Sequence, residues 1–65
     1  MKIQLKFDLP VSGIHGMKAG RIFEVVALGA GGRRGPRWYV RGDAGEMVGV
    51  LDREAEAVDV LENQN

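Results

Sequence analysis

The chain has 65 residues, no cysteine, one histidine and a formal net charge of zero. A chain this short forms one domain with a modest core, because it buries only about 60% of the surface that its unfolded form exposes. Its composition excludes a disulfide framework and a structural zinc site as sources of stability. An idealised barrel or self-association must then supply the stability, and we expect one small β-barrel domain over residues 1–62 with a frayed tail at 63–65.

The zero net charge conceals a strong asymmetry along the chain. Residues 1–42 carry eight Lys or Arg and two acidic residues, whereas residues 43–65 carry one Arg and seven acidic residues. This division predicts a charged partner, pairing of the two ends, or pairing between copies in an oligomer such as a dimer. Residues 1–9 mix charged and apolar residues, which is typical neither of a signal peptide nor of a membrane span, so we expect a cytoplasmic protein with no membrane contact.

Two strands are predicted in the first half of the chain. Ile3, Leu5 and Phe7 alternate with polar residues, which is typical of a strand with one buried face. Residues 21–28 form a β-branched and mostly apolar run, which we expect to be the most buried strand.

A long loop, rich in proline and glycine, separates these two strands at residues 9–20. Its side chains Val11, Ile14 and Met17 have no predicted strand to join. They either form an exposed, adaptable patch for a partner or pack beneath the loop and close the end of the barrel.

Residues 29–36, called the Arg loop below, contain four glycines, two arginines and a proline. This composition predicts a flexible surface loop without regular structure. The glycines suggest a phosphate-binding loop, but Pro36 and a strand follow where that motif requires a helix N-terminus. We therefore expect no nucleotide site and no cofactor.

The second half of the chain predicts a hairpin and a closing element. Turn residues at 42–45 separate the apolar runs 37–41 and 46–51, which is a clear hairpin signal. Residues 52–61 show both helical and alternating spacing, which a helical turn over 52–56 and a short closing strand over 57–61 would satisfy. The predicted fold is all-β, a small closed five-stranded SH3-like or OB-like barrel.

Two motifs carry a resemblance to a known family. A Lys-x-Gly-Arg-x-aromatic-x-Val pattern occupies residues 18–25, and Trp38 precedes an Asp-x-Gly-Glu turn at residues 43–46. The middle of the chain thereby resembles small SH3-like barrel proteins of phages, prophages and mobile elements, although residues 49–52 lack the usual aromatic and proline. This resemblance implies the fold and a small accessory or inhibitory protein acting on a host complex, and it implies no active site.

Few residues suggest chemistry. His15 has Asp8 and Ser12 nearby in sequence, but one histidine in a glycine-rich loop is ordinarily solvent-facing, and a chain this small does not easily build a pocket that excludes water. Metal sites need several His or Cys ligands, or the oxygen spacing of a calcium loop, and neither pattern occurs. We expect no enzyme and no metal.

Four arginines lie close to two aromatic residues. The cluster comprises Arg33, Arg34, Arg37, Trp38, Tyr39 and Arg41. It predicts a surface where guanidinium groups pair with phosphates and a base stacks on an aromatic ring. The alternative is that Trp38 is the main core residue, and that the arginines are solvated or pair with the acidic C-terminal segment.

The acidic C-terminal segment also has two interpretations. Its carboxylates are Asp52, Glu54, Glu56, Asp59 and Glu62. They form either a binding surface for a basic partner or simply a solvated end.

From these patterns we expect a non-catalytic module that binds a protein partner, with residues 9–20 beside the Arg loop as its recognition rim. The alternative is single-stranded nucleic-acid or RNA binding through the arginine and aromatic cluster. The predicted partner contacts are Val11, Ile14, Met17, Arg33, Arg34, Arg37, Arg41, Asp52, Glu54 and Glu56.

Overall fold

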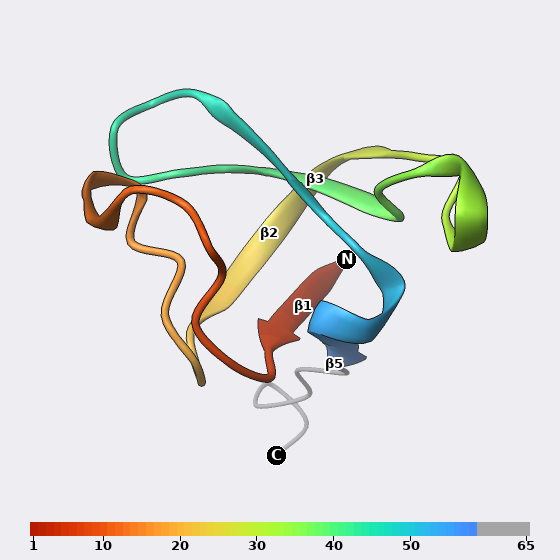
Figure 1. Cartoon of the computed structure of the whole chain (residues 1–65), viewed down its shortest axis with the longest axis horizontal. Coiled ribbons are helices and arrows are strands. Elements are labelled where there is room, and N and C mark those ends of the chain that lie inside the picture. Colours follow the sequence, from red (N-terminus) through yellow and green to blue (C-terminus); the bar gives the residue numbers. More distant parts are fainter. Residues whose placement is uncertain (59–65) are drawn as a thin grey trace, which may run out of the picture.

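The computed structural model describes residues 1–58, which form a single antiparallel sheet of five strands in the order β4-β3-β2-β1-β5 (Figure 1). The strands are β1 (Lys2–Leu5), β2 (Ile22–Leu28), β3 (Trp38–Arg41), β4 (Met47–Val50) and β5 (Ala55–Val58). Three short 3-10 turns lie in the connections: η1 (Gly13–His15), η2 (Gly32–Arg34) and η3 (Asp52–Glu54). The predicted class, an all-β five-stranded SH3-like fold with a helical turn near residues 52–56, is confirmed.

The predicted hairpin is also confirmed, whereas full closure of the barrel is wrong. Arg41 pairs with Met47 across β3 and β4, and the turn is closed by Gly42 N–H donating to the Glu46 carbonyl at 2.8 Å. Within residues 1–58, β4 and β5 are the two edges of the sheet, joined through η3 rather than by strand pairing. The closing strand begins at Ala55, and its predicted end at residue 61 and the tail at 63–65 lie outside the described residues.

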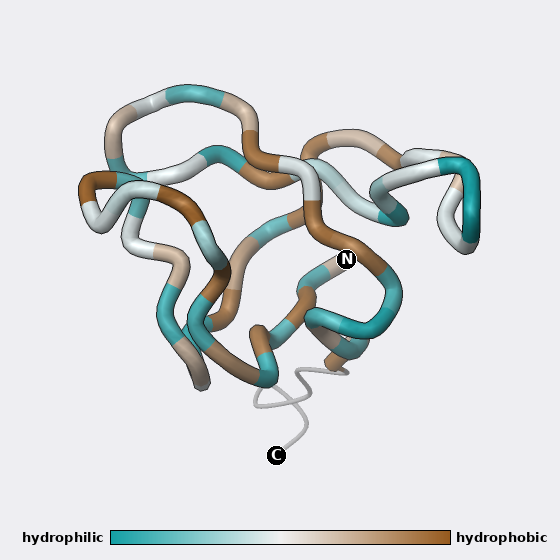
Figure 2. The backbone as a smooth tube through the Cα atoms, in the orientation of Figure 1, coloured by the Kyte–Doolittle hydropathy of each residue, from teal (hydrophilic) through white to brown (hydrophobic). Residues whose placement is uncertain are grey.

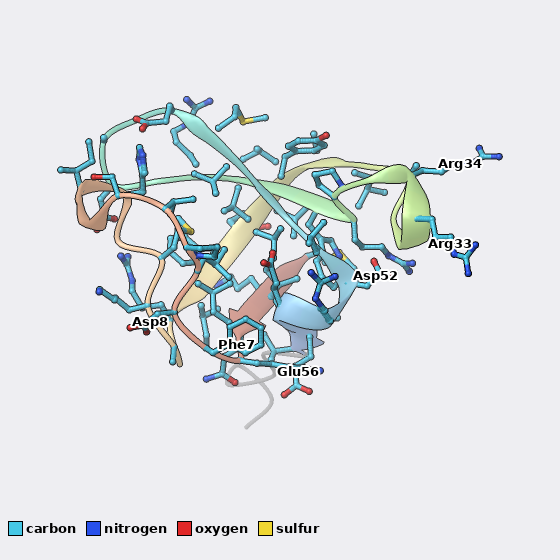
Figure 3. The ribbon with its side chains drawn as sticks, in the orientation of Figure 1. Phe7, Asp8, Arg33, Arg34, Asp52 and Glu56 are labelled. Carbon is cyan, nitrogen blue, oxygen red and sulfur yellow. The ribbon has the colours of Figure 1, made fainter. Side chains whose placement is uncertain are left out.

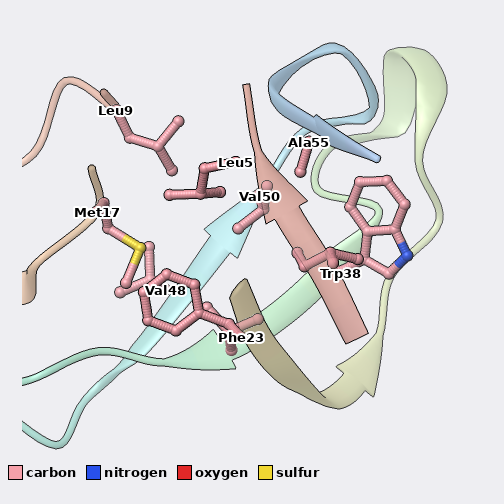
Figure 4. Close-up of a cluster of buried hydrophobic side chains, with 10 residues drawn as sticks. Leu5, Leu9, Met17, Phe23, Trp38, Val48, Val50 and Ala55 are labelled. Atoms are coloured by element: carbon pink, nitrogen blue, oxygen red, sulfur yellow. The ribbon is translucent and has the colours of Figure 1, made fainter. Parts of the chain in front are cut away.

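The core lies on the concave inner face of the curled sheet (Figure 4). Its buried members are Ile3, Leu5, Leu9, Met17, Phe23, Trp38, Val40, Val48, Val50 and Ala55. Trp38 is only 6% exposed, so the single tryptophan is a core residue and not a surface platform. Burying each large apolar side chain of this kind contributes roughly 1.5–3 kcal/mol, which is substantial for a domain of this size.

Strand β2 is the element that differs most from expectation, because it is largely exposed and not the most buried strand. The register pairs Phe23 with Ile3 and Val25 with Val40, which turns Phe23 and Val25 toward the core. The alternate side chains therefore point outward, and Ile22 and Val26 are each 47% exposed. A register shift between Val25 and Ala27 interrupts the pairing with β3. No part of residues 1–58 covers the outer side of this strand.

The two motifs that carry the family resemblance contact each other, and they hold the loop at residues 9–20, called the first loop below, against the β3–β4 turn. Arg21 donates to the Asp43 carboxylate at 2.8 Å and to the Gly16 carbonyl at 3.0 Å, and Asp43 N–H donates to the His15 carbonyl at 3.0 Å. The His15 imidazole also contacts the Glu46 carboxylate. These motif residues are explained by folding, because they tie two turns together that are distant in sequence.

Candidate functional site

The two loops predicted to form one recognition rim do not lie together. In Figure 1 the first loop, which contains η1, lies at the left end of the molecule and the Arg loop lies at the right end. The neighbour of the first loop is the β3–β4 turn, to which it is bonded through His15 and Asp43. The predicted rim is therefore wrong, and the two ends of the molecule have to be considered separately.

One of the partner contacts predicted on the first loop is buried in the structure. Met17 is 2% exposed and packs in the core, because its carbonyl accepts the Leu9 N–H at 2.9 Å and this pairing turns the loop inward. Val11 and Ile14 remain exposed, at 43% and 65%. Met17 thus packs beneath the loop, and of its three predicted apolar contacts only Val11 and Ile14 are left exposed.

The Arg loop is a defined structure and not the irregular loop that its composition predicts. At its base, Gly29 N–H donates to the Arg37 carbonyl at 2.8 Å, and Gly31 N–H donates to the Pro36 carbonyl at 3.1 Å. At its tip, Arg34 N–H donates to the Gly31 carbonyl at 3.1 Å within η2. These bonds pair the two arms of the loop and give its tip a fixed shape.

Asp52 does not belong to the Arg loop in the sequence, but its side chain holds the loop in place. Its carboxylate accepts the Gly32 N–H at 3.0 Å, although the two residues are twenty positions apart in the sequence. Gly31 is buried beneath this contact, and a Cβ atom there would lie 3.0 Å from both the Asp52 carboxylate and the Arg37 side chain. Asp52 therefore positions the Arg loop, a role that differs from the partner contact predicted for it.

We expect Asp52→Ala to loosen the Arg loop and Asp52→Asn to preserve most of its shape. Alanine removes the acceptor for Gly32 N–H, whereas the asparagine amide oxygen can still accept it. The bond is exposed, so we expect Asp52→Ala to lower the free energy of unfolding by about 0.5–1.5 kcal/mol. Hydrogen exchange at the Gly32 amide should accelerate in the alanine variant and change little in the asparagine variant. Equal exchange in both variants would contradict the role of the carboxylate.

Arg33 and Arg34 form the exposed tip of this loop. Both belong to η2, where consecutive residues are about 120° apart around the axis, and Figure 3 shows their side chains pointing away from the barrel in different directions. Among residues 1–58 neither guanidinium group forms an ion pair. The tip is also hydrophilic along the backbone trace (Figure 2). Two separately placed cations are therefore available for anionic groups of a partner.

The other two arginines of the cluster are engaged within the domain. The Arg37 guanidinium lies 5.8 Å from the centroid of the Trp38 ring, and Arg41 donates to the Gly45 carbonyl at 2.7 Å. The predicted cluster therefore divides into two arginines at the tip, which have no ion-pair partner among residues 1–58, and two that contact other parts of the domain. Because the Trp38 ring is buried, Tyr39, which is partly exposed, is the one predicted stacking ring of the cluster that is left.

The acidic residues likewise have separate roles. Glu54 is only 8% exposed, and its carboxylate accepts the Leu51 N–H at 2.8 Å while its own N–H donates to the Leu51 carbonyl at 2.9 Å. It closes η3, so its prediction as a partner contact is wrong. Glu56 is exposed on β5, where it pairs with Gln4 in the register. Asp59 and Glu62 lie outside the described residues.

Leu28 is a residue of this surface that the sequence pattern misses. It is the last residue of β2, pairs with Trp38 and begins the Arg loop, yet it is 72% exposed. The pattern assigns it to a buried strand, and only its position next to Gly29 indicates that the strand ends there. The Arg-loop surface therefore combines two guanidinium groups at its tip with an apolar side chain at its base.

Within residues 1–58 the structure groups no three His, Cys, Asp or Glu side chains as a metal site would require, and it contains no helix of the length and apolarity needed to span a membrane. His15 is half-buried against the β3–β4 turn rather than solvent-facing as predicted.

The chain matches no model of a known protein family, no curated protein and no solved structure in the comparisons made.

Proposed function

We propose that the protein is a non-catalytic module that binds a protein partner through the Arg-loop surface, made of Arg33, Arg34 and Leu28. The observation that carries this proposal is the fixed presentation of two exposed guanidinium groups without ion-pair partners among residues 1–58. Arginine is enriched in protein interfaces, and an ordered loop loses less entropy on binding than a mobile one. Leu28, which is exposed at the base of the same loop, adds an apolar side chain to this surface.

The chemistry of this surface favours an acidic partner. Because Arg33 and Arg34 point in different directions, they suit two carboxylates on a folded surface or an acidic segment better than one shared carboxylate. The resemblance to small SH3-like proteins of phages and mobile elements supports a host complex as the source of that partner. We infer an accessory or inhibitory role in which this loop occupies an acidic site of the complex.

Nucleic-acid binding is the second candidate, and the exposed arginines are the feature that favours it. The buried Trp38 weakens it, because a single-stranded binder uses exposed rings on which bases stack, and of the two predicted rings only the partly exposed Tyr39 is left. The zero net charge of the chain also differs from the basic balance of such modules.

Titrations of the ¹⁵N-labelled protein separate the two candidates. One series uses a short acidic peptide of alternating Glu and Leu, and the other uses a short oligothymidylate, each at about 0.05 M and about 0.2 M NaCl. We expect the peptide to shift the amide signals of residues 28–34 and to bind more tightly than the oligonucleotide. Tighter binding of the oligonucleotide, with a steep salt dependence, would instead support the nucleic-acid function.

We expect Arg33→Glu/Arg34→Glu to weaken peptide binding about tenfold or more, because two charge-assisted contacts become repulsive. The matched control is Lys6→Glu/Lys18→Glu, which changes the net charge equally at two exposed positions away from the Arg loop. A similar loss in both variants would show that only total charge matters, and it would contradict a site at the Arg loop.

A further inference from the structure

Strand β4 leaves one of its two edges without a partner strand among residues 1–58. It pairs with β3 on one side, and on its other side the described chain has no strand. No backbone group of residues 47–49 forms a hydrogen bond with a loop or turn of the described chain either. A row of peptide groups is therefore open along this edge, and such a row can pair with the backbone of another chain.

The register identifies the peptide groups that face this edge. Gly42 N–H donates to the Glu46 carbonyl at 2.8 Å, so these two residues form a hydrogen-bonded pair where β3 and β4 meet the turn. Hydrogen-bonded and non-hydrogen-bonded pairs alternate along antiparallel strands, so Met47 and Gly49 form non-hydrogen-bonded pairs with β3. Their N–H and C=O groups therefore point away from β3 and toward the free edge. These are also the two residues of β4 that are not buried.

Apart from its short length, β4 has none of the features that protect an edge strand from pairing. Natural edge strands carry lysine or other charged residues, proline, or a bulge. The sequence of β4 is Met-Val-Gly-Val, without charge or proline, and its pairing with β3 has no register shift. The other edge, β5, carries the exposed Glu56 and is followed by residues outside the described part of the chain. Of the two edges, β4 is the one suited to an added strand.

The C-terminal end of β4 adjoins the Arg loop. Arg37, which follows this loop, donates its N–H to the Val50 carbonyl at 2.8 Å, and the Asp52 carboxylate accepts the Gly32 N–H at 3.0 Å. A strand added along β4 would therefore end beside the loop. The edge supplies peptide groups and no charge, whereas the tip of the loop supplies two guanidinium groups without ion-pair partners among residues 1–58. This combination fits an extended chain with carboxylates near one end.

We propose that β4 accepts an extended acidic segment of the protein partner as an additional strand of the sheet, with carboxylates at one end of that segment contacting the Arg loop. This inference rests on the proposed function, because it specifies how the acidic partner binds. Backbone hydrogen bonds along the edge contribute affinity, and the two guanidinium groups select segments with acidic residues at the correct end. Proline is excluded from the segment at positions whose N–H faces β4.

Amide hydrogen exchange of the ¹⁵N-labelled protein, free and saturated with the acidic peptide of alternating Glu and Leu, tests the proposal. We expect exchange at the Met47 and Gly49 amides to slow about tenfold or more on binding, because their N–H groups become bonded to the peptide. The amides of Val48 and Val50 face β3 and are the internal controls, so they should slow severalfold less. Equal slowing at all four amides, or no slowing at Met47 and Gly49 in the saturated protein, would overturn the addition of a strand.

Two backbone-methylated forms of the same peptide provide an independent readout at unchanged charge. One is methylated at the nitrogens of its Leu residues and the other at those of its Glu residues. Alternate N–H groups of an extended strand face opposite edges, so one form should bind about tenfold more weakly or worse and the other should change severalfold less.

The outcomes separate this inference from the proposed function. Binding that is lost in Arg33→Glu/Arg34→Glu but is equal for all three peptides would overturn the added strand and keep the Arg-loop site. A peptide that does not bind the wild type in any form would overturn both.

Discussion

Replacing Trp38 with alanine is expected to leave the isolated domain largely unfolded at room temperature. The side chain is 6% exposed and belongs to the cluster that joins the inner faces of β1, β3 and β4. Removing a buried tryptophan costs about 3–5 kcal/mol. The total stability of a chain of this length is roughly 3–10 kcal/mol, so the loss is comparable to the whole. Urea unfolding followed by far-UV circular dichroism measures this directly.

Trp38→Phe is the informative control for that experiment. Phenylalanine keeps an aromatic ring in the core and removes the indole N–H, which is buried and has no hydrogen-bond partner among residues 1–58. We expect it to lower stability by less than about 1.5 kcal/mol, because the lost volume is partly offset by removal of an unsatisfied donor. An alanine variant that unfolds cooperatively at the wild-type urea midpoint would show that Trp38 is not part of the core.

Local signals in the sequence were sufficient for the order of the elements. The turn residues at 42–45 fix the β3–β4 hairpin, and the short-range helical spacing after Leu51 marks η3, because both structures are closed by bonds between residues close in sequence. The exposure of the outer side of β2 could not be predicted from such local signals. An apolar run does not reveal whether a second layer covers its outer face, and in this fold no such layer is present among residues 1–58.

The candidate site was predictable only in part for a related reason. The surface position of Arg33 and Arg34 follows from the composition of their loop. The roles of Asp52 and Glu54 do not, since one carboxylate caps a loop twenty residues away and the other closes its own turn. Met17 was ambiguous because a long loop can fold over the end of a barrel or away from it, and only the pairing with Leu9 decides between the two.

Gly29→Ala is expected to destabilise the domain and to disturb the Arg loop at the same time. A Cβ atom at this position would lie 2.1 Å from the Pro36 carbonyl oxygen, which is backbone and cannot move aside as a flexible side chain can. The two arms of the loop would separate, and the bond from Gly29 N–H to the Arg37 carbonyl would lengthen or break. Overpacking of this kind costs about 1–3 kcal/mol. In a domain of this size, that corresponds to a fall of roughly 5–20 °C in the melting temperature.

The matched control is Gly13→Ala, because a Cβ atom at Gly13 meets no heavy atom within 4 Å. That variant should melt within a few degrees of the wild type, or slightly higher, since alanine restricts the unfolded chain.

The functional consequence also distinguishes the two glycines. If the shape of the Arg loop presents Arg33 and Arg34 to a partner, Gly29→Ala should weaken binding of the acidic peptide although no charge has changed, and Gly13→Ala should not. Unchanged affinity in a folded Gly29→Ala variant would show that the guanidinium groups act through their charge alone, independently of the geometry of the loop.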